Sequence, residues 1–320
     1  MKITSTFTKK YHANGFLFVV CVILLISQDV QAFEITQNPQ MPVENNFIVG
    51  PSKIELTVAN GDSKTTTLLV ENRTGKKQTF KISFEDFVAG SGESAVSLLG
   101  AETSKTSLKN FLFVEKDTFT LNHGERLSLP VTVSIPANSI PGGKFASVLV
   151  SAIAETSRVT ESESAYTGSL VLGRIGSLFF VTVPGNTLSS GELVSLKTKN
   201  QKKLFFSNQI PLRIEYRNSG NVSLNPYGIL EIKNVFGEVV SKKILDPWYT
   251  LPESIRTRDI LVEGSFFGRY TAIAQVNRGY EDIVDSKSFT FYVISNEALA
   301  LLGILIIVAF FVIWKKRNTQ

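Results

Sequence analysis

A repeated alternation of apolar and polar residues along the middle of the chain is the feature that most constrains its fold. Residues 53–58 (KIELTV), 126–135 (RLSLPVTVSI) and 210–217 (IPLRIEYR) place apolar side chains at every second position. Because successive side chains of a strand point to opposite faces, this period predicts strands with one buried and one solvated face. Pro130 and Pro211 indicate edge positions, since proline cannot donate to a ladder.

Two longer segments complete the β pattern. Residues 144–154 (KFASVLVSAIA) carry small or apolar residues on both faces, which predicts a central strand. The segment GSLVLGRIGSLFFVTVP is too long for one flat strand, and Gly173 and Gly176 mark an expected bend or bulge. Many short strands between turns predict an all-β fold of two tandem Ig-like β-sandwich domains, which we place at residues 33–190 and 191–294.

The same turn pattern occurs once near the start of each predicted sandwich. In LVENRTGKK a strand ends at Asn72 before a turn containing Gly75, and in EYRNSGNVS a strand ends at Asn218 before Gly220 and Asn221. Asparagine and glycine tolerate positive φ, and the asparagine side chain can bond to its own backbone. The five residues are therefore predicted to form hairpin or loop corners.

The N-terminus is typical of a secretory signal. Residues 1–12 are basic, and the apolar run at residues 15–26 is too short to cross a bilayer, which needs roughly 20 residues. We expect a signal peptide at residues 1–32, with an uncleaved anchor as the alternative. The one cysteine, Cys21, lies within this run, so the exported chain is expected to hold no disulfide, which favours a bacterial cell surface.

The C-terminal segment predicts a transmembrane helix. Residues 298–314 carry no charge and no proline, and they would span roughly 25 Å as a helix. The expected membrane flank consists of Trp314, Lys315, Lys316 and Arg317. Positive charge beside a span stays cytoplasmic, so we expect a single-pass protein of the cell membrane, with its sandwiches outside and residues 315–320 as a cytoplasmic tail. A buried core helix is the alternative.

The net charge of +5 comes from the two ends of the chain. Six of the 33 basic residues and one of the 28 acidic residues lie in the terminal segments, which leaves 27 of each between them. The predicted exported part is formally neutral, which argues against nucleic acid as a partner.

Catalytic and metal-binding patterns are not found in the sequence. His123 is the one histidine of the exported part and is expected to be a solvated turn residue, whereas triads and zinc sites need several positioned groups. Glu85 and Asp86 are adjacent on a strand and therefore point to opposite faces. We predict no enzyme activity, no metal and no cofactor.

The candidate ligand surface is the proline-bounded loop at residues 246–254, which holds Trp248 and Tyr249. Aromatic side chains on loops stack on sugars or anchor protein interfaces. The alternative is that one of them plugs the end of the sandwich.

Two segments carry a resemblance to a known family. The stretches IVGPSKIELTVANGDSKTTTLLVENRTGKKQTFKISF and FTLNHGERLSLPVTVSIPANSIPGGKFASVLVSA resemble the DUF916 domain of bacterial surface proteins, the WxL-interacting or WxL protein peptidoglycan-binding family. The resemblance implies a signal peptide, two Ig-like sandwiches and a C-terminal membrane helix. It also implies a scaffold role, with the first domain binding peptidoglycan and the second another surface protein.

Two other functions remain open from the sequence. The first is an assembly factor similar to pilus chaperones, which share two sandwiches and act by strand addition. The second is an envelope hydrolase that uses carboxylates alone. Because sandwiches host many functions, the fold alone does not choose among these hypotheses.

Overall fold

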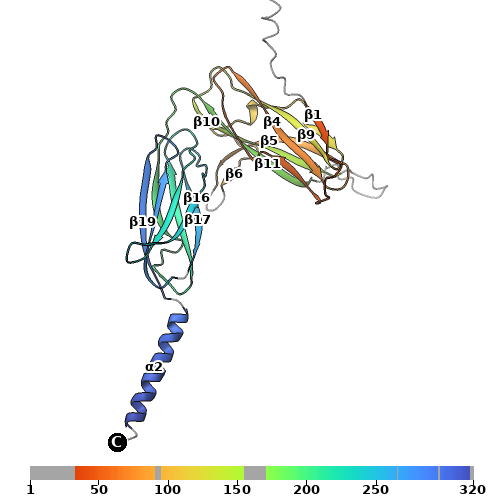
Figure 1. Ribbon diagram of the computed structural model, residues 1–320. Coiled ribbons are helices and arrows are strands. Elements are labelled where there is room, and N and C mark those ends of the chain that lie inside the picture. The colour runs from red at the N-terminus through yellow and green to blue at the C-terminus, as the bar shows by residue number, and fades with distance from the viewer. Residues whose placement is uncertain (1–32, 91–94, 155–170, 265, 295, 318–320) are drawn as a thin grey trace, which may run out of the picture.

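The structure is a computed structural model in which β-strands make up nearly all of the regular structure (Figure 1). The described residues are 33–90, 95–154, 171–264, 266–294 and 296–317. The predicted signal peptide, residues 1–32, lies outside them. Within the described part the chain forms two β-sandwiches, a short 3-10 helix, η1 (Lys109–Phe111), and one α-helix.

The first sandwich consists of two sheets built from β1 to β11. One sheet has the order β1 (Glu34–Gln37), β9 (Glu125–Ser134), β4 (Ser63–Arg73) and β2 (Asn46–Gly50), with β7 (Leu112–Phe113) also on β9. The other has the order β3 (Lys53–Thr57), β11 (Val171–Val183), β10 (Gly142–Ile153), β5 (Gln78–Ala89) and β6 (Val96–Leu98), with β8 (Thr118–Leu121) also on β5.

The second sandwich repeats this arrangement with β12 to β19. Its smaller sheet has the order β12 (Gly191–Thr198), β14 (Gln209–Asn218) and β17 (Ser254–Glu263). Its larger sheet has the order β13 (Leu204–Phe205), β19 (Val284–Val293), β18 (Gly268–Asn277), β15 (Tyr227–Lys233) and β16 (Val239–Leu245). In each sandwich the last strand pairs antiparallel with the strand before it and parallel with a short strand from near the domain's start.

Burial follows the alternation in the sequence. Along β9 the side chains from Leu127 to Val133 alternate between fully buried and partly exposed. Along β10, which lies between β11 and β5, nearly every side chain is buried, as predicted for a central strand. Each sandwich has its own apolar core, so its sheets are held together mainly by burial of the inward faces.

The two predicted corners share one set of hydrogen bonds around a fully buried asparagine. The amide nitrogen of Asn72 donates to the carbonyls of Lys76 (2.8 Å) and Leu121 (2.9 Å), and its oxygen accepts the Thr74 N–H (2.9 Å). In both corners the asparagine bonds to the residues two and four positions later and to a backbone carbonyl that is distant in the sequence.

Asn218 repeats this arrangement in the second sandwich. Its amide nitrogen donates to the carbonyls of Val222 (2.8 Å) and Thr250 (2.9 Å), and its oxygen accepts the Gly220 N–H (2.9 Å). The repeated turn pattern in the sequence therefore marks one structural device that is used twice.

The corner residues after each asparagine have different roles. Gly75 has a φ of +79°, a left-handed conformation that glycine adopts without strain. A Cβ at Gly220 would lie 2.1 Å from the Leu188 carbonyl, so glycine is needed there for close backbone approach. Asn221 bonds through its side chain to Leu188 N–H and the Asn186 carbonyl, which ties the segment before β12 to the corner.

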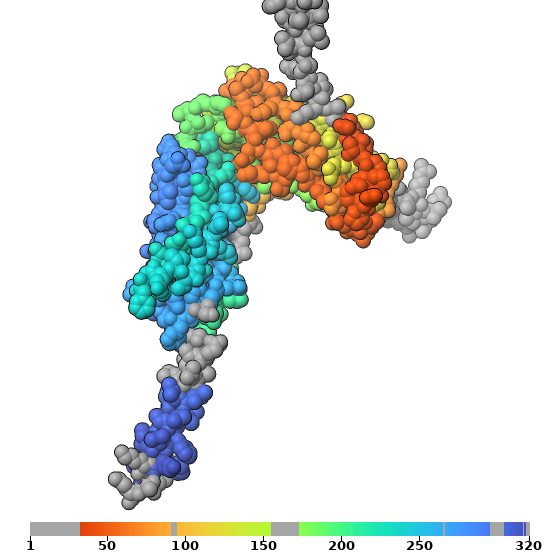
Figure 2. All heavy atoms as spheres, in the orientation of Figure 1, coloured from red at the N-terminus to blue at the C-terminus, as the bar shows by residue number. Residues whose placement is uncertain are grey.

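An aromatic cluster joins the two sandwiches. Phe87, Phe145 and Phe180 lie on the outer face of the β5–β10–β11 sheet and pack against Tyr249 and Leu251 from the loop before β17. The ring centroids of Phe180 and Tyr249 are 4.9 Å apart in an edge-to-face arrangement. These apolar contacts are buried between the domains, so they stabilise one relative placement of the sandwiches (Figures 1 and 2).

Hydrogen bonds surround the aromatic cluster. The backbone N–H of Gly143 in β10 donates to the Asn221 carbonyl of the second corner at 2.7 Å. The Asn225 amide donates to Glu55 Oε1 of β3 at 2.9 Å. The second asparagine corner is thus part of the junction, which gives it a contact that the first corner does not share.

The C-terminal segment forms the predicted helix, α2 (Asn296–Arg317), but the prediction that it crosses a membrane is wrong. Among the residues that the structure describes, no helix combines the length and apolar character that a membrane span requires.

Three sequence predictions are corrected with this finding. They are the transmembrane helix at residues 298–314, the membrane as a partner, and the single-pass location at the cell membrane with residues 315–320 in the cytoplasm. Trp314, Lys315 and Arg317 lie in the last turns of α2, where Trp314 packs against Phe311 with ring centroids 5.7 Å apart. Lys316 also lies within the helix.

We expect Asn72→Ala to destabilise the first sandwich by about 2–4 kcal/mol, because it leaves buried backbone groups without partners. Urea unfolding followed by circular dichroism measures the change. Asn200→Ala removes the same amide from an exposed turn and should stay within about 0.5 kcal/mol of the unchanged chain. Equal effects of the two substitutions would contradict this account of the corner.

We expect Tyr249→Ala to loosen the junction, because it removes the ring that packs against Phe180 in the aromatic cluster. Differential scanning calorimetry should then resolve separate unfolding of the two sandwiches more clearly than in the unchanged chain. Tyr292→Ala, at an exposed position of β19, is the matched control. A calorimetric profile that is identical for both variants would show that the cluster does not couple the domains.

Candidate functional site

The predicted ligand aromatics lie inside the protein. Trp248 is buried in the second core, where it packs edge-to-face on Tyr216 with ring centroids 6.2 Å apart. Tyr249 is half-buried in the junction cluster, with the Arg256 guanidinium 4.2 Å from its ring centroid. The loop therefore connects domains in this structure, and a ligand contact by these two residues stays a prediction.

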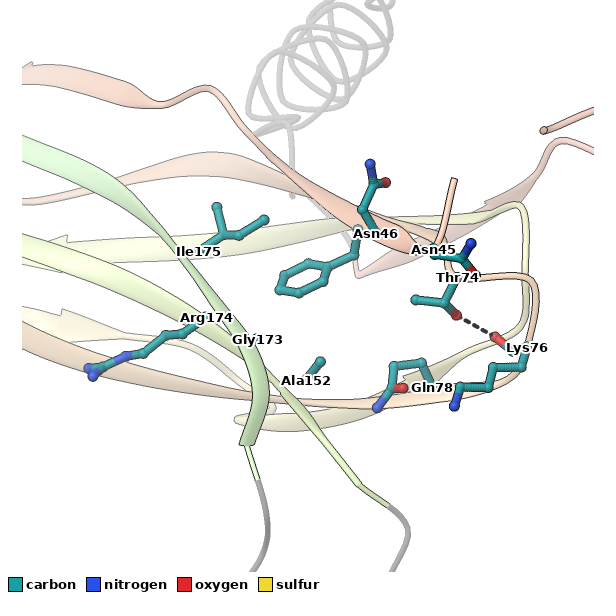
Figure 3. A pocket seen from close by; sticks show the side chains of 10 residues that line it. Asn45, Asn46, Thr74, Lys76, Gln78, Ala152, Gly173, Arg174 and Ile175 are labelled. Atoms are coloured by element: carbon teal, nitrogen blue, oxygen red, sulfur yellow. Dashed lines mark hydrogen bonds between the residues drawn. The ribbon is translucent and has the colours of Figure 1, made fainter. Parts of the chain in front are cut away.

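A pocket of about 470 Å³ opens at the side of the first sandwich, between the edges of its two sheets (Figure 3). Its walls come from the start of β2, the first corner, the end of β10 and the start of β11. The lining residues are Asn45, Asn46, Phe47, Thr74, Lys76, Gln78, Ala152, Gly173, Arg174 and Ile175. The volume is in the range of pockets that hold a side chain or a small ligand.

The opening arises where the chain changes from one sheet to the other. β2 pairs with β4 from Asn46 to Gly50, and β3 then pairs with β11 only from Leu178 onward. Among the described residues, no strand pairs with the outer edge of β11 before Leu178. The first half of β11 and the outer edge of β2 therefore face each other across the pocket.

Backbone groups on both sides point into this gap. Leu178 N–H points outward and donates to the Ser52 carbonyl at 2.9 Å, so Gly176 and Arg174 present their backbone groups on the same side. Across the gap, Phe47 of β2 lies opposite Asn72 of β4. The Asn72 carbonyl points away from β2, toward β9, where it accepts the Gly124 N–H at 2.8 Å. The backbone N–H and carbonyl of Phe47 are therefore directed away from β4, toward the opening.

The side chains give the pocket an apolar floor and a polar rim. Phe47 and Ala152 are buried, and Ile175 is partly buried. On the rim, Gln78 donates to the Ile153 carbonyl at 2.6 Å, and the Thr74 hydroxyl donates to the Lys76 carbonyl at 3.0 Å (Figure 3). The site can thus bury an apolar group while it offers hydrogen bonds at its edge.

The charged groups around the rim are mostly basic. Arg174 pairs with Glu85, with Nη2 and Oε2 2.5 Å apart, and Arg73 pairs with Glu44 at 3.3 Å. Lys76 lies on the rim as an exposed residue of the corner. The excess of positive charge favours an acidic group beside the pocket.

The second sandwich has the same opening between β12 and β19, but its own side chains bridge it. The Tyr280 hydroxyl accepts the Gly191 N–H at 2.8 Å, and Asp285 Oδ2 accepts the Leu193 N–H at 2.8 Å. Arg278 holds Asp285 through two hydrogen bonds of 3.0 and 2.8 Å. The edge backbone groups that face a gap in the first sandwich are satisfied here by side chains.

Electrostatics strengthens this bridge. Burial alone would raise the pKa of Asp285, but the hydrogen bonds from Arg278 and from the Leu193 N–H outweigh it and hold the pKa below its ordinary value. The hydrogen bond to Asp285 raises the pKa of Arg278 further above its ordinary value. The pair is therefore ionised throughout the neutral range.

The pocket was not predicted from the sequence, and one residue beside it differs from its prediction. His123 was expected to be solvated, but its Nδ1 accepts the Gly75 N–H at 3.2 Å and its Nε2 lies 2.9 Å from the Met41 carbonyl. It ties the segment before β2 to the first corner. Among the residues that the structure describes, no group of three or more His, Cys, Asp or Glu could hold a metal ion.

No family model and no curated protein matches this chain. Solved structures that resemble it include the class 5 fimbriae chaperone CfaA, at 17% identity and a TM-score of 0.38, over 77% of this chain and 99% of that one. The CsuC chaperone complex of Acinetobacter baumannii Csu pili has 11% identity and a TM-score of 0.35 over 78% and 99%. The E. coli chaperone DraB has 14% and 0.34 over 78% and 97%.

Similarity at this level carries no argument about what this chain binds. The structures just named are described as fimbrial chaperones and a chaperone–subunit complex, not as peptidoglycan-binding proteins. The prediction of peptidoglycan as a partner is corrected on the structure itself, because Trp248 and Tyr249, the aromatic residues that were to stack on a sugar, already pack within the protein.

We expect Asp285→Asn to destabilise the second sandwich by about 2 kcal/mol at pH 7, since it weakens charge-assisted bonds across the opening. A carboxylate whose folded pKa is lowered contributes its stability above the unfolded value near ~3.9 and loses it as the pH falls through the folded value. The difference between variant and unchanged chain should therefore shrink below about pH 4.

Urea unfolding at pH 7 and at acidic pH measures this difference. Asp282→Asn, at an exposed turn position, is the matched control and should leave the stability nearly unchanged at every pH. A difference for Asp285→Asn that does not change with pH would show that the ionised carboxylate is not what stabilises the bridge.

Proposed function

We propose that this chain is a binding protein, not an enzyme, and that its first sandwich captures an extended segment of a partner protein by strand addition. The observation that carries the proposal is the unpartnered outer edge of β11 beside an apolar pocket. This is the assembly-factor hypothesis of the sequence analysis, with a defined edge. Resemblance to the WxL-interacting family stays part of the proposal, without its membrane helix and its peptidoglycan ligand.

An added segment would gain two kinds of contact at this edge. Its backbone can pair with the outward N–H and carbonyl groups of Arg174 and Gly176, each hydrogen bond contributing about 0.5–1.5 kcal/mol net. One of its side chains can enter the pocket over Phe47 and Ile175, where burial of a large apolar group contributes about 2–3 kcal/mol. Main-chain pairing gives affinity and the pocket gives specificity, as in other strand-addition complexes.

The adjacent carboxylates support binding over hydrolysis. Glu85 is engaged with Arg174 and with the Gly100 N–H, while Asp86 is fully buried and accepts the N–H groups of Leu108 and Lys109 at 2.8 Å each. Each carboxylate thus has a structural role, and the two do not share an open cleft. A glycoside hydrolase needs both of its catalytic carboxylates beside one scissile bond.

Arg174→Pro tests the proposal, with Arg174→Ala as its matched control. Both remove the ion pair with Glu85, but only proline removes the outward N–H donor, and an outward N–H is not needed for pairing with β10. Random nine-residue peptides displayed on phage are selected against the full chain, and the enriched peptides are measured by fluorescence polarisation. We expect them to bind the proline variant at least tenfold more weakly than the alanine variant.

Two outcomes would contradict strand addition at β11. One is selection that enriches no peptide on the full chain. The other is equal binding of the enriched peptides to both variants when circular dichroism shows that both are folded. If the proline variant does not fold, Gly173→Asp, which places a side chain into the opening without changing the backbone donors, takes its place.

A further inference from the structure

The second sandwich indicates what the open pocket of the first one binds. The two domains have matching strand orders, in which β2, β4 and β9 correspond to β12, β14 and β17. On the other sheet, β3, β11, β10 and β5 correspond to β13, β19, β18 and β15. Side chains of the chain itself bridge the second opening, whereas among the described residues no side-chain hydrogen bond joins β2 to the first half of β11, so the bridged opening is an internal template.

Counted from the ends of the strands that border each opening, the register relates positions of the two sandwiches. Asn72 lies opposite Phe47 and Asn218 lies opposite Gly191, so Phe47 and Gly191 are equivalent edge residues. Ala152 and Val276 are the buried residues before the last position of β10 and β18. On the last strand of each sandwich, Ala152 pairs with Gly173 and Val276 pairs with Asp285.

The equivalent positions differ in the side chains that reach across the opening. In the second sandwich Asp285 accepts a backbone N–H of β12, whereas Gly173 has no side chain to reach β2. In the second sandwich a tyrosine hydroxyl lies 2.8 Å from the Gly191 nitrogen and 3.3 Å from its oxygen. The backbone groups of Phe47 face the opening without such a partner among the described hydrogen bonds.

We infer that the pocket of the first sandwich recognises a tyrosine side chain followed by an acidic residue, supplied by the extended segment of the partner. The inference rests on the proposed function and names the chemistry of its ligand. The ring lies against the apolar floor, and its hydroxyl bonds to the outward backbone groups of Phe47. The carboxylate takes the place of Asp285 beside Gly173.

The basic rim supports the acidic half of this motif. Arg278 holds the carboxylate in the second sandwich, and Lys76 and Arg174 are the cations at the rim of the first. Two carboxylates also lie near the rim, but Glu85 and Glu44 are paired with Arg174 and Arg73. Added negative charge is therefore favoured, whereas a basic segment would meet Lys76 and Arg174.

The aromatic half is supported by the floor and the volume. Phe47 offers an aromatic surface, and Phe80 lies behind it with ring centroids 5.1 Å apart. A third ring fits edge-to-face on such a pair, and about 470 Å³ exceeds what one ring needs. A purely aliphatic side chain would fill the floor and leave the backbone groups at the edge without partners.

The chain supplies its own probe for the test. A synthetic peptide of residues 277–285, NRGYEDIVD, carries Tyr280 and Asp285, the two residues that bridge the second sandwich. Its binding to the full chain is measured by fluorescence polarisation, beside peptides in which the tyrosine is replaced by phenylalanine or by alanine. We expect the phenylalanine peptide to bind several-fold more weakly and the alanine peptide at least tenfold more weakly.

Variants of the protein place the peptide in the pocket. Gly173→Asp mimics the second sandwich and should abolish binding, because its carboxylate occupies the acidic position. Gly173→Ala is the matched control, since its Cβ would meet only the Phe47 ring at an ordinary 3.5 Å. We expect the alanine variant to bind the peptide with an affinity within about threefold of the unchanged chain. Since a tenfold change in affinity corresponds to about 1.4 kcal/mol, this difference is less than about 1 kcal/mol.

The outcomes separate this inference from the proposed function. Random peptides that bind at β11 but show no enrichment of tyrosine and acidic residues would overturn the inference and leave strand addition standing. Equal binding of the tyrosine and alanine peptides would overturn it as well. If no peptide binds and Gly173→Asp converts a dimer of the full chain into a monomer, the occupant is a second copy, and both proposals fail.

Discussion

The crossing of one edge strand from sheet to sheet determines where this protein is open. β2 pairs with β4, and after a short connection β3 pairs with β11. A single segment can satisfy only one edge at a time, so the first half of β11 has no neighbour while β2 occupies the other sheet. The pocket, its outward backbone groups and the proposed strand addition all depend on this crossing.

The buried asparagines stabilise the corners beside the openings. The side-chain amide of each asparagine bonds to backbone groups of the corner that would otherwise have no partner. A buried polar group without a partner costs about 1–3 kcal/mol. The two corners nevertheless have different surroundings. The second corner meets Gly143 of the first domain through Asn221, whereas Thr74 and Lys76 of the first corner line the open pocket. One device thus serves a junction in one domain and a candidate binding site in the other.

The strands and the asparagine corners could be predicted from the sequence, because both depend on residues that are close together along the chain. The strand predictions at residues 53–58, 126–135 and 210–217 are confirmed by β3, β9 and β14, and the repeated asparagine turn predicts both corners. Pro130 and Pro211 were expected at sheet edges, yet β9 and β14 are both interior strands. On one side of each proline the pairing with the neighbouring strand is interrupted: β1 and β7 pair with β9 before and after Pro130, and β12 pairs with β14 only from Leu212 onward. The backbone N–H that proline lacks would therefore have no ladder partner on that side.

Features that depend on distant pairing could not be predicted in this way. Trp248 and Tyr249 were predicted to be loop aromatics that contact a ligand, because their neighbours in the sequence are prolines and polar residues. In the structure Tyr249 packs against Phe180, which lies on a strand about seventy positions earlier. The pocket combines β2 with β11, and Gly173 indicated only a bend. Apolar character alone predicted a membrane span in the C-terminal helix, but among the described residues no helix combines the length and the apolar character that a span requires.

The geometry of β10 and β11 relates the junction to the candidate site. Gly143 near the start of β10 contacts the second domain, while Ala152 near its end lines the pocket. At about 3.3 Å per residue these two positions are roughly 30 Å apart along the strand. β11 returns antiparallel from the pocket to the aromatic cluster at Phe180. A segment added at Arg174 and Gly176 would therefore extend a sheet whose far end is already fixed by the second domain. The proposed binding at the pocket lies at the opposite end of β10 and β11 from the junction, so it leaves the contacts between the two sandwiches in place.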